Sequence, residues 1–552
     1  MTDPIRLGTR ASTLARTQSA TVGDALAEVS GRPWVEVLVT TPGDDTTKPL
    51  DQPGTPGLFV STLRKALLSG DVDVIVHSFK DLPSAPEPGL LLAAVPTRAD
   101  PRDALVSRSG LGLSQLEPGS VIGTSSPRRA AALRRLRPDL HVVPIRGNVD
   151  TRIRKVRDGE VDATILAVAG MARIGRADEI TEILDDLLPA PAQGALAVEC
   201  RAGDTAMAML LSRLDDPLAR VLTAAERQVL VGINAECTTA VAAGATWHND
   251  TLVLRAELTV DGTWSSTRIE ASCPLGNTAI ARTVGQRAAA HLVAPDRRPV
   301  LLVRSEGNST DADALRALGI PSISDPFIRI SPRVDDPAAA DLLSALQRAA
   351  AGDEAVRTWL IATSPMAVPS WLASLPGEDL TRLARAAESA GVRTAATGER
   401  TAGTLRDIGF ESVLVPSEDA SAAGVLAALE SEPTGRALLP RGNLALPTLP
   451  NGLRERGWRV DEAVVYDTVA VPDRPGSADL VENGEVAAVV LRSPSAVAAL
   501  IAHARVPDGV AVVCSGTTTA DAAREAGLRV TAVSRTPTPS GLAEAVAAAL
   551  GG

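Results

Sequence analysis

The chain of 552 residues is too long to fold around one hydrophobic core and should divide into several domains. Hydrophobic residues make up 45% of it but aromatic residues only 2%, which favours helices packed on parallel strands over an aromatic-rich β-sandwich. A net charge of −11 argues against a general nucleic-acid binder, which needs a surplus of basic residues. We therefore expect an α/β protein without a nucleic-acid partner.

Neither the cysteines nor the hydropathy indicates a secreted or membrane protein. The four cysteines, at positions 200, 237, 273 and 514, form no C-x-x-C pair, so we expect neither a disulfide framework nor a metal site. The chain has no apolar leader after Met1 and no run of about 18 apolar residues. We expect a cytoplasmic monomer with no membrane partner.

The first residues predict a strand, a turn and a helix between positions 5 and 29. Arg10 and Ser12 lie at the turn, where they could offer a guanidinium group and a hydroxyl to an anion. Simple capping of the helix explains Ser12 equally well. A polar loop rich in Pro and Gly follows at 41–57 and is long enough to form a lid or a binding loop.

The next strand ends abruptly in polar side chains. Residues 72–76 have the β-branched profile of a strand buried on both faces. Ligand sites in open α/β sheets lie beyond the carboxyl ends of strands. The polar side chains at this position are His77, Ser78, Lys80 and Asp81. Asp81 could equally cap a turn, because Asp-x-Pro is ordinary turn chemistry.

A local excess of positive charge follows. Residues 124–157 hold ten basic residues against two acidic ones. Such a run is usually a solvated helix face, but four arginines lie at strand-to-helix junctions, where a helix N-terminus adds to the positive field. These junctions contain Arg128, Arg129, Arg146 and Arg152, with the hydroxyls of Thr124, Ser125 and Ser126. Because guanidinium groups bind carboxylates through paired hydrogen bonds, we expect a substrate with several carboxylates.

Cys237 lies in a polar loop after a helix predicted at 218–231. A free cysteine is most often a small buried hydrophobe, but a loop cysteine can also be a nucleophile or an attachment point. Two or three strands with an Asp-Gly hairpin turn are predicted at 246–271, and a helix at 278–292. The polar, Pro-containing segment 293–299 is the clearest domain boundary and the expected linker.

An internal repeat marks the second half. A Ser-Pro pair occurs at Ser364 and Ser493, and a Gly-x-x-Thr-Ala motif begins at Gly398 and Gly516. The repeat predicts two similar α/β units facing a cleft lined by hydroxyls and helix N-termini, although ordinary N-caps explain each instance separately. The candidate contacts are Thr363, Ser364, Thr401, Ser493, Ser495, Thr518 and Thr519. Because no Lys, His or Cys accompanies these motifs, we expect the cleft to shape a polyanionic ligand.

Residues 1–292 resemble hydroxymethylbilane synthase (porphobilinogen deaminase) along their whole length. The motifs that carry the resemblance are Val76–Pro83, Gly123–Arg129, Arg146–Arg152, Gln193-Gly194 and the Cys237 loop. The resemblance implies two periplasmic-binding-protein-like α/β domains and a small α+β cofactor domain. The implied boundaries are 1–97 with 196–216 for the first domain, 98–195 for the second and 217–292 for the third.

The resemblance also assigns roles. Asp81 would be the catalytic carboxylate that handles protons while ammonia leaves porphobilinogen, and Cys237 would carry a dipyrromethane cofactor through a thioether. The carboxylate side chains would be held by Arg10, Ser12, Ser78, Lys80, Thr124, Ser125, Ser126, Arg128, Arg129, Arg146 and Arg152. Two departures stand out: Thr55-Pro-Gly replaces a Gly-Lys-Gly of many relatives, which removes a lid lysine, and residues 234–236 replace the usual glycines before the cysteine.

Residues 300–552 are similar to uroporphyrinogen-III synthase, on the strand order, the repeated turns and Leu439–Gly442 followed by Val465-Tyr466. The resemblance implies two α/β domains, 300–328 with 470–552 and 329–469, whose parallel sheets face a cleft. It further implies cyclisation of hydroxymethylbilane with inversion of the fourth ring to give uroporphyrinogen III. Tyr466 would assist loss of the substrate hydroxyl, and its alternative is a packing residue at an interdomain hinge.

Two other functions stay open at this point. The crossed-over α/β organisation of the first 216 residues also fits a solute-binding protein for anions, although the missing signal peptide counts against it. The second half could also be a degenerate module that only regulates the first.

Overall fold

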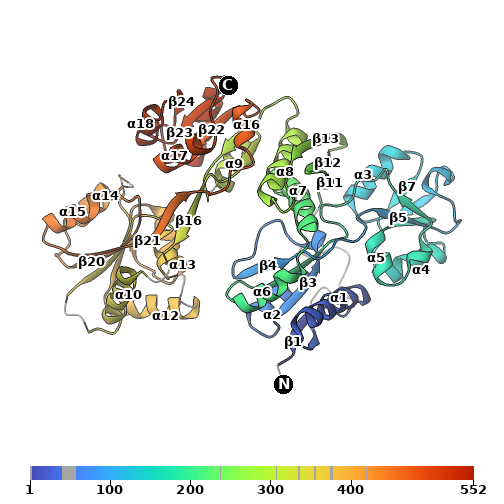
Figure 1. The fold of residues 1–552 in the computed structure, drawn as a ribbon, viewed down its shortest axis with the longest axis horizontal. Helices are drawn as coiled ribbons and strands as arrows, with labels where there is room; N and C mark the ends of the chain where they lie inside the picture. Colours follow the sequence, from blue (N-terminus) through green and yellow to red (C-terminus); the bar gives the residue numbers. More distant parts are fainter. Residues whose placement is uncertain are drawn as a thin grey trace.

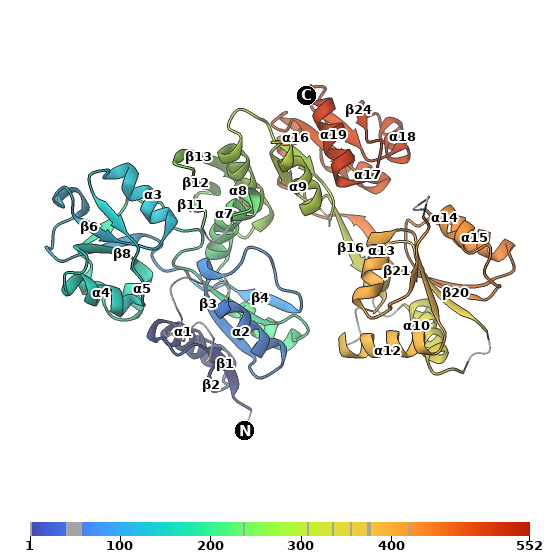
Figure 2. The same ribbon diagram turned by 180° about the vertical axis from the view of Figure 1, so that it is seen from behind.

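The computed structural model describes residues 3–39, 58–235, 238–305, 308–333, 336–353, 356–372, 377–417, 419 and 421–551. The predicted lid loop at 41–57 and Cys237 lie outside the described residues. The α/β class is confirmed, because the described residues form five sheets with helices packed on them (Figures 1 and 2).

Three of the five sheets belong to the first half, and two of these three share one topology. Their strand orders are β2-β1-β3-β10-β4 and β7-β6-β8-β5-β9. In each sheet the fourth strand, β10 or β5, runs antiparallel to both neighbours, and the chain crosses between the sheets next to these two strands. This exchange of one strand is consistent with the crossed-over α/β domains implied by the sequence.

The strand and helix predicted between positions 5 and 29 are observed among these elements, and the strand predicted at 72–76 is observed two residues later. The first sheet contains β1 (Ile5–Thr9), β2 (Trp34–Leu38), β3 (Val74–Ser78), β4 (Leu90–Ala94) and β10 (Leu196–Arg201). The second contains β5 (Asp103–Ser107), β6 (Val121–Gly123), β7 (His141–Val143), β8 (Ala163–Ala167) and β9 (Glu182–Leu184). The helices on them are α1 (Thr13–Ser30), α2 (Leu58–Leu68), α3 (Pro127–Leu136), α4 (Val149–Arg157), α5 (Val168–Arg173) and α6 (Thr205–Leu211).

A three-stranded antiparallel sheet and two helices complete the first half. They are α7 (Pro217–Ile233), β11 (Ala240–His248), β12 (Thr251–Val260), β13 (Thr263–Ser272) and α8 (Thr278–Val293). The predicted hairpin turn is confirmed, since Asp261 and Gly262 both have positive φ angles of 49° and 79°, as a type I′ turn requires.

The second half consists of two largely parallel sheets, with orders β15-β14-β22-β23-β24 and β16-β21-β20-β17-β18-β19. Strands β22, β23 and β24 of the first correspond in order to β17, β18 and β19 of the second, and β14 and β15 correspond to β20 and β21. This correspondence gives the sequence repeat a structural basis, because the repeated Ser-Pro and Gly-x-x-Thr turns follow corresponding strands.

The elements of the second half have the following bounds. The first sheet and its helices are β14 (Val300–Leu302), α9 (Asn308–Ala317), β15 (Ser322–Ser324), α16 (Ala478–Glu482), β22 (Ala488–Leu491), α17 (Pro494–His503), β23 (Ala511–Cys514), α18 (Thr517–Glu525), β24 (Val530–Val533) and α19 (Pro539–Ala549). The second sheet and its helices are β16 (Ile328–Pro332), α10 (Pro337–Ala350), β17 (Thr358–Ala362), α11 (Ala367–Leu372), α12 (Gly377–Ser389), β18 (Arg393–Ala396), α13 (Glu399–Asp407), β19 (Val413–Leu414), α14 (Ala422–Ala428), β20 (Arg436–Gly442), α15 (Thr448–Glu455) and β21 (Arg459–Ala470).

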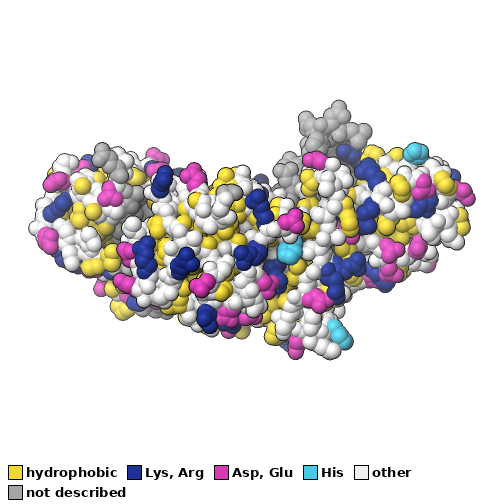
Figure 3. All heavy atoms as spheres, turned by 90° about the horizontal axis from the view of Figure 1, so that it is seen from above, with side chains coloured by type: hydrophobic (Ala, Val, Ile, Leu, Met, Phe, Trp, Pro, Cys, Tyr) yellow, Lys and Arg dark blue, Asp and Glu magenta, His cyan; other side chains and the backbone are white. Residues whose placement is uncertain are grey.

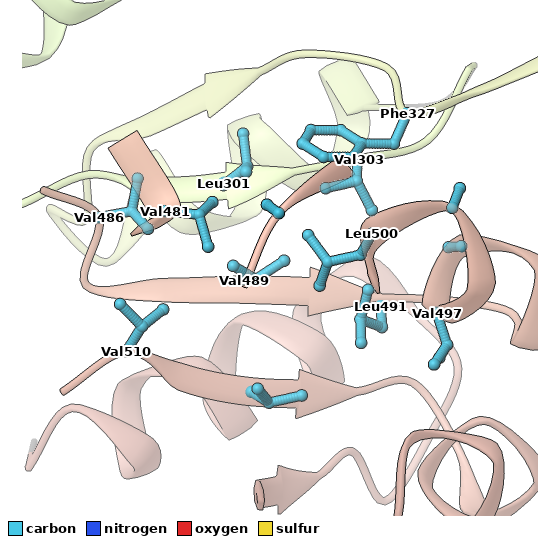
Figure 4. Packing of buried hydrophobic residues seen from close by; sticks show 14 of the residues in the cluster. Leu301, Val303, Phe327, Val481, Val486, Val489, Leu491, Val497, Leu500 and Val510 are labelled. Atoms are coloured by element: carbon cyan, nitrogen blue, oxygen red, sulfur yellow. The ribbon is translucent and has the colours of Figure 1, made fainter. Parts of the chain in front are cut away.

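Aliphatic side chains fill the core of the last sheet unit, as the composition predicts. Leu301 from β14 and Val489 from β22 lie in one cluster with Phe327 and Leu500, and each of these residues is fully buried (Figure 4). Burying one such side chain contributes about 1.5–3 kcal/mol. Since β14 and β22 are far apart in sequence but adjacent in the sheet, this core ties the two ends of the second half together.

Strands β16 and β21 connect the two sheets of the second half (Figure 1). They pair antiparallel from Ile328 opposite Ala470 to Pro332 opposite Tyr466. The backbone N–H of Val471 donates to the carbonyl of Phe327 at 2.9 Å. The two segments of chain that pass from one sheet to the other therefore run side by side.

The surface carries charges of both signs. On the face in Figure 3, Lys and Arg side chains are interspersed with Asp and Glu. Among the helices that the structure describes, none is long and apolar enough to cross a membrane. No group of three or more His, Cys, Asp or Glu suited to a metal ion occurs in the described part of the chain.

A buried carboxylate on α7 joins three parts of the first half. Glu226 is 0% exposed and accepts both terminal N–H groups of Arg98, at 2.8 and 2.9 Å. It also accepts the backbone N–H groups of Ala192 and Ala245 at 2.7 and 2.8 Å. A buried charge needs such partners, so Glu226 fixes helix α7 and strand β11 against the segments that join the two sheets.

We predict that Glu226→Gln lowers the free energy of unfolding of the first half by about 3 kcal/mol, because the amide NH₂ would face donors and leave Arg98 buried without a counter-charge. Chemical denaturation monitored by circular dichroism measures this change. Glu160→Gln is the matched control, since Glu160 is 56% exposed and pairs only with Lys155, so its loss should cost under about 1 kcal/mol. Equal effects of the two substitutions would contradict the role of Glu226.

Candidate functional site

Two adjoining cavities lie where all three sheet units of the first half meet. Their volumes are about 1020 and 990 Å³, and they share Arg10, Ser78, Lys80, Asp81 and Arg129 as wall residues. The first sheet contributes the turns after β1 and β3, and the second contributes the turns after β6 and β7. These turns follow the carboxyl ends of parallel strands, the position predicted for a ligand site.

The apolar residues of the turn that contains Asp81 are buried, and its charged residues face the cavities. Phe79 and Leu82 are each 6% exposed and pack in one core cluster, whereas Asp81 is exposed. Arg227 from α7 donates to the carbonyl oxygens of Phe79 and Leu82 at 3.0 and 3.2 Å, and its guanidinium lies 4.6 Å from the Phe79 ring. A carboxylate is thus fixed at the cavity wall on a turn whose backbone is itself anchored.

Two of the predicted arginines share one buried counter-charge. Asp103 on β5 is 0% exposed, and each of its carboxylate oxygens lies 2.7 Å from a guanidinium nitrogen, one from Arg128 and the other from Arg129. Burial alone would raise the pKa of Asp103, but the two guanidinium groups hold that pKa well below its usual value. The pair of arginines therefore stays rigidly oriented at the cavity floor.

Lys80 is part of the same network. Its Nζ donates to Oε1 of Gln193 at 3.2 Å, and Nε2 of Gln193 donates to Asp103 at 2.9 Å. Burial lowers the pKa of Lys80 to about 8, with the charges of Arg129 and Arg128 acting in the same direction and Asp81 opposing them. Lys80 is therefore a cation that can lose its proton slightly above neutral pH.

Most of the predicted hydroxyls also have structural partners. Ser12 caps α1 by accepting from Ala15 N at 3.3 Å, and Ser126 caps α3 by accepting from Arg129 N at 3.4 Å. Ser125 exchanges hydrogen bonds with the backbone of Ile145. The capping alternative is thus realised, yet Ser12, Ser125 and Ser126 still line the cavities.

The structure brings together nearly all residues predicted for this site. The wall residues of one or both cavities include Arg10, Ser12, Ser78, Lys80, Asp81, Ser125, Ser126, Arg128, Arg129, Arg146 and Arg152. Thr124 is 4% exposed and accepts from Ser126 N at 3.2 Å. Cys237 is not among the described residues, but its neighbours Ala235 and Thr238 line the second cavity.

Several wall residues escaped sequence reasoning. Gln18 donates to Ser78 Oγ at 2.9 Å, and Arg173 donates to the carbonyl of Gly194 at 2.7 Å. Arg173 is the last residue of α5, the short helix that directly follows strand β8, and Leu166 and Ala167 at the end of β8 also line the cavity, so a search of the segment after each strand could have found it. Gln18 gave no signal, because it is a polar residue inside a helix.

His77 lines the second cavity, as predicted, but most of its side chain is buried. It ends strand β3 as a 7% exposed residue, and its Nε2 lies 3.4 Å from Oε2 of Glu199. Burial would raise the pKa of Glu199, but hydrogen bonds from His77 and Arg64 lower it to about 2. The strand extends two residues further than the β-branched run suggested, which turns His77 inward.

In the second half, Tyr466 and Ser364 lie together. The phenol hydroxyl of Tyr466 donates to Ser364 Oγ at 2.9 Å, although Tyr466 is only 8% exposed and belongs to a hydrophobic cluster. A Cβ atom on Gly442 would come within 2.5 Å of the Tyr466 ring, so glycine leaves the room that the ring occupies. Tyr466 therefore packs in the core of its sheet and also makes a polar contact.

The other candidate contacts of the second half differ in their surroundings. The hydroxyls of Ser493 and Ser495 lie 2.9 Å apart at the start of α17, where Ser493 caps the helix. Thr401 and Thr519 are the third residues of α13 and α18, and each is 4% exposed, so their side chains pack inside their own units. Thr518 is exposed and Thr363 is half-buried.

Both halves of the chain match known protein families. Residues 5–209 match the family described as porphobilinogen deaminase, dipyromethane cofactor binding domain, and residues 309–544 match uroporphyrinogen-III synthase HemD. The chain is 52% identical over 242 residues to the porphobilinogen deaminase of Nocardia farcinica, covering 44% of this chain and 69% of that protein. It is 51% identical over 259 residues to the porphobilinogen deaminase of Thermobifida fusca, and the match covers 46% of this chain and 81% of that protein.

One solved structure of a uroporphyrinogen III synthase, a mutant of the Thermus thermophilus protein, is 23% identical with a TM-score of 0.31. It covers 46% of this chain and 98% of that one.

The pKa of Lys80 predicts a pH dependence for anion binding. Below pH 8 the ammonium group is charged, and it loses its proton as the pH rises through about 8, so a polycarboxylate probe such as mellitate should bind more weakly at pH 9 than at pH 7. Isothermal titration calorimetry measures this difference. Lys80→Arg, which stays charged over this range, should flatten the dependence, and an unchanged pH profile in that variant would contradict the assignment.

Proposed function

The first half of the chain belongs to the porphobilinogen deaminase family and the second half carries a uroporphyrinogen-III synthase part, and from this we propose the chemistry of each half. The chain is a bifunctional tetrapyrrole biosynthesis enzyme, a fusion of hydroxymethylbilane synthase and uroporphyrinogen-III synthase. The first half joins four porphobilinogen molecules with loss of ammonia to give hydroxymethylbilane. The second half closes this product, with inversion of ring D, to uroporphyrinogen III.

One observation carries the proposal for the first half. An exposed carboxylate, Asp81, lies on the wall of a cavity of about 1020 Å³ that is also lined by Arg10, Arg129, Arg146 and Arg152. Porphobilinogen and its oligomers carry acetate and propionate groups, which guanidinium groups bind through paired hydrogen bonds. The arginines would therefore hold the substrate carboxylates while Asp81 faces the pyrrole.

Asp81 is suited to the proton and charge changes of the reaction. When ammonia leaves porphobilinogen, positive charge develops on the pyrrole, and a fixed carboxylate close to it lowers the energy of that state. The carbon–carbon bond-forming step then releases a proton, which the same carboxylate can accept. Arg227 supports this role indirectly, because its hydrogen bonds hold the turn that carries Asp81.

The residues present fit a dipyrromethane cofactor. The second cavity, of about 990 Å³, has Ala235, Thr238 and Thr239 on one wall, next to the position of Cys237 in the chain, and Arg128 and Arg129 on another. Its size and its guanidinium groups suit a two-ring molecule with four carboxylates. Cys237 would hold the group through a thioether, and the bound group supplies a fixed pyrrole end to which substrate is added.

The proposal also includes the domain boundaries, the oligomeric state and the location in the cell. The two crossed-over sheets would form domains 1–97 with 196–216 and 98–195, and the antiparallel sheet would form the domain 217–292 that holds the cofactor. In the second half, domains 300–328 with 470–552 and 329–469 would face a cleft that holds hydroxymethylbilane. A monomeric state and a cytoplasmic location complete the proposal and rest on the sequence predictions alone.

The two alternatives are less well supported. A solute-binding role for the first half leaves the match to a biosynthetic family unexplained. A degenerate second half makes a distinct prediction, because hydroxymethylbilane that is not closed by an enzyme cyclises to the type I isomer. Chromatography of the oxidised porphyrins formed from porphobilinogen distinguishes the two, since only type I product would mean that the second half is inactive.

We predict that Asp81→Asn slows consumption of porphobilinogen by about 10²–10⁴-fold, because the amide cannot accept the proton or balance the cation. Release of porphyrin from purified protein measures the rate, and intact-mass analysis checks that the variant still carries the cofactor. Asp71→Asn is the matched control, since Asp71 is an exposed carboxylate at the other end of the same strand. Near-normal turnover of the Asp81→Asn protein would refute the assignment.

Tyr466→Phe should reduce formation of the type III isomer by less than about tenfold and lower stability by about 1 kcal/mol, because it removes one hydrogen bond from a packed phenol. Ser364→Ala removes the other partner of the same bond and serves as the matched comparison. If Tyr466 acts on the substrate, the ratio of type III to type I product falls in Tyr466→Phe alone. Equal ratios in both variants would assign Tyr466 a packing role only.

A further inference from the structure

Helix α8 is buried on more than one face. Residues Ala281, Val284 and Ala288 pack into the core of the antiparallel sheet unit, as expected for an amphipathic helix. On a different face, Thr283 and Gln286 are only 4% and 9% exposed. Polar side chains are seldom buried without partners, so this second face indicates a specific contact.

Gln286 pairs with the edge strand of the second half. Its Oε1 accepts from Ser324 N at 2.5 Å and its Nε2 donates to Ser324 O at 3.0 Å, so one side-chain amide exchanges two hydrogen bonds with one residue of β15. This is the pattern by which paired residues of neighbouring antiparallel strands bind. Since β15 is the edge of its sheet, α8 covers backbone groups that would otherwise be unpaired at this position.

A second contact lies one turn away on the same helix. The carboxylate of Asp325, 8% exposed, accepts from Ser477 N at 2.8 Å and from Thr283 Oγ1 at 3.4 Å. A Cβ atom on Gly476 would lie 2.9 Å from Ile280 Cα, so the loop before α16 approaches the backbone of α8 directly. The chain forms this sheet in two segments, one before β16 and one after β21. Both segments therefore contact helix α8.

The linker is also held. Arg298 Nη1 donates to the carbonyl of Gly484 at 2.7 Å, and Arg297 Nη1 donates to that of Gly319 at 3.2 Å. Arg287 on α8 pairs with Glu485 at 2.5 Å. The end of the segment 293–299 is thus bound to the second half through Arg297 and Arg298, which differs from a flexible tether.

We propose that the face of α8 formed by Ile280, Thr283 and Gln286 is a docking surface that fixes the second half to the third sheet unit of the first half in one orientation. The partner it fits is the β15 edge and the 476–477 loop of the same chain. The two halves then form one body, and the spacing of their two sites is set by this contact and not by linker length. This inference is independent of the chemistry proposed for either half.

The test uses the full chain and two substitutions. Gln286→Glu keeps the shape but replaces the donor to Ser324 O by a carboxylate oxygen, and Gly476→Leu places a side chain where α8 stands. Gln115→Glu and Gly203→Leu are the matched controls. Gln115 is exposed, and its side-chain oxygen accepts from Gly112 N, which a carboxylate can also do. A Cβ atom on Gly203 would meet nothing within 4 Å.

Small-angle X-ray scattering should fit a single arrangement for the unmodified chain and the controls, and a larger maximum dimension for the two docking variants. Limited trypsin digestion at Arg297 should accelerate by about tenfold in the variants, because cleavage follows the population of the opened state. Circular dichroism confirms that both variants remain folded. Rapid cleavage and a flexible ensemble in the unmodified chain, or no change in either folded variant, would overturn the proposal.

Discussion

The first half depends on one electrostatic constraint, which is that guanidinium groups gathered around a cavity repel one another unless a counter-charge is built in. Asp103 meets that constraint at the cavity floor, where Arg128 and Arg129 lie 2.7 Å from its two oxygens. A buried ion pair gives little net stability, because desolvation offsets the attraction. Its value here is orientation, since it fixes two cations for a ligand with several carboxylates before that ligand arrives.

The same principle appears at the domain junction. Glu226 is a fully buried carboxylate whose partners are one guanidinium group and two backbone N–H groups from separate segments. Helix α7, which carries Glu226, also carries Arg227, and Arg227 holds the turn of Asp81. The helix that precedes the Cys237 loop is therefore connected through charged contacts to the proposed catalytic carboxylate, although the two belong to different sheets.

Directional polar contacts join the two halves of the chain. Gln286 and Thr283 satisfy Ser324 and Asp325 with hydrogen bonds, and close packing at Gly476 completes the contact. Such a surface favours one fixed orientation, because amide and hydroxyl groups are directional while an apolar patch is not. The proposed reaction sequence gives this a use, since a product released from one half then meets the other half at a constant distance.

Sequence alone determined most local features and predicted most of the polar residues that line the two cavities. The β-branched run before Asp81, the arginines at helix starts and the Asp-Gly turn each report a short-range preference, so they predicted β3, the α3 junction and the β12–β13 hairpin. Contacts set by tertiary packing could not be predicted from the sequence. Burial of His77, the hydroxyl of Tyr466 on Ser364 and the docking of Gln286 on β15 all depend on which distant segment lies opposite, and one sequence contains no record of that pairing.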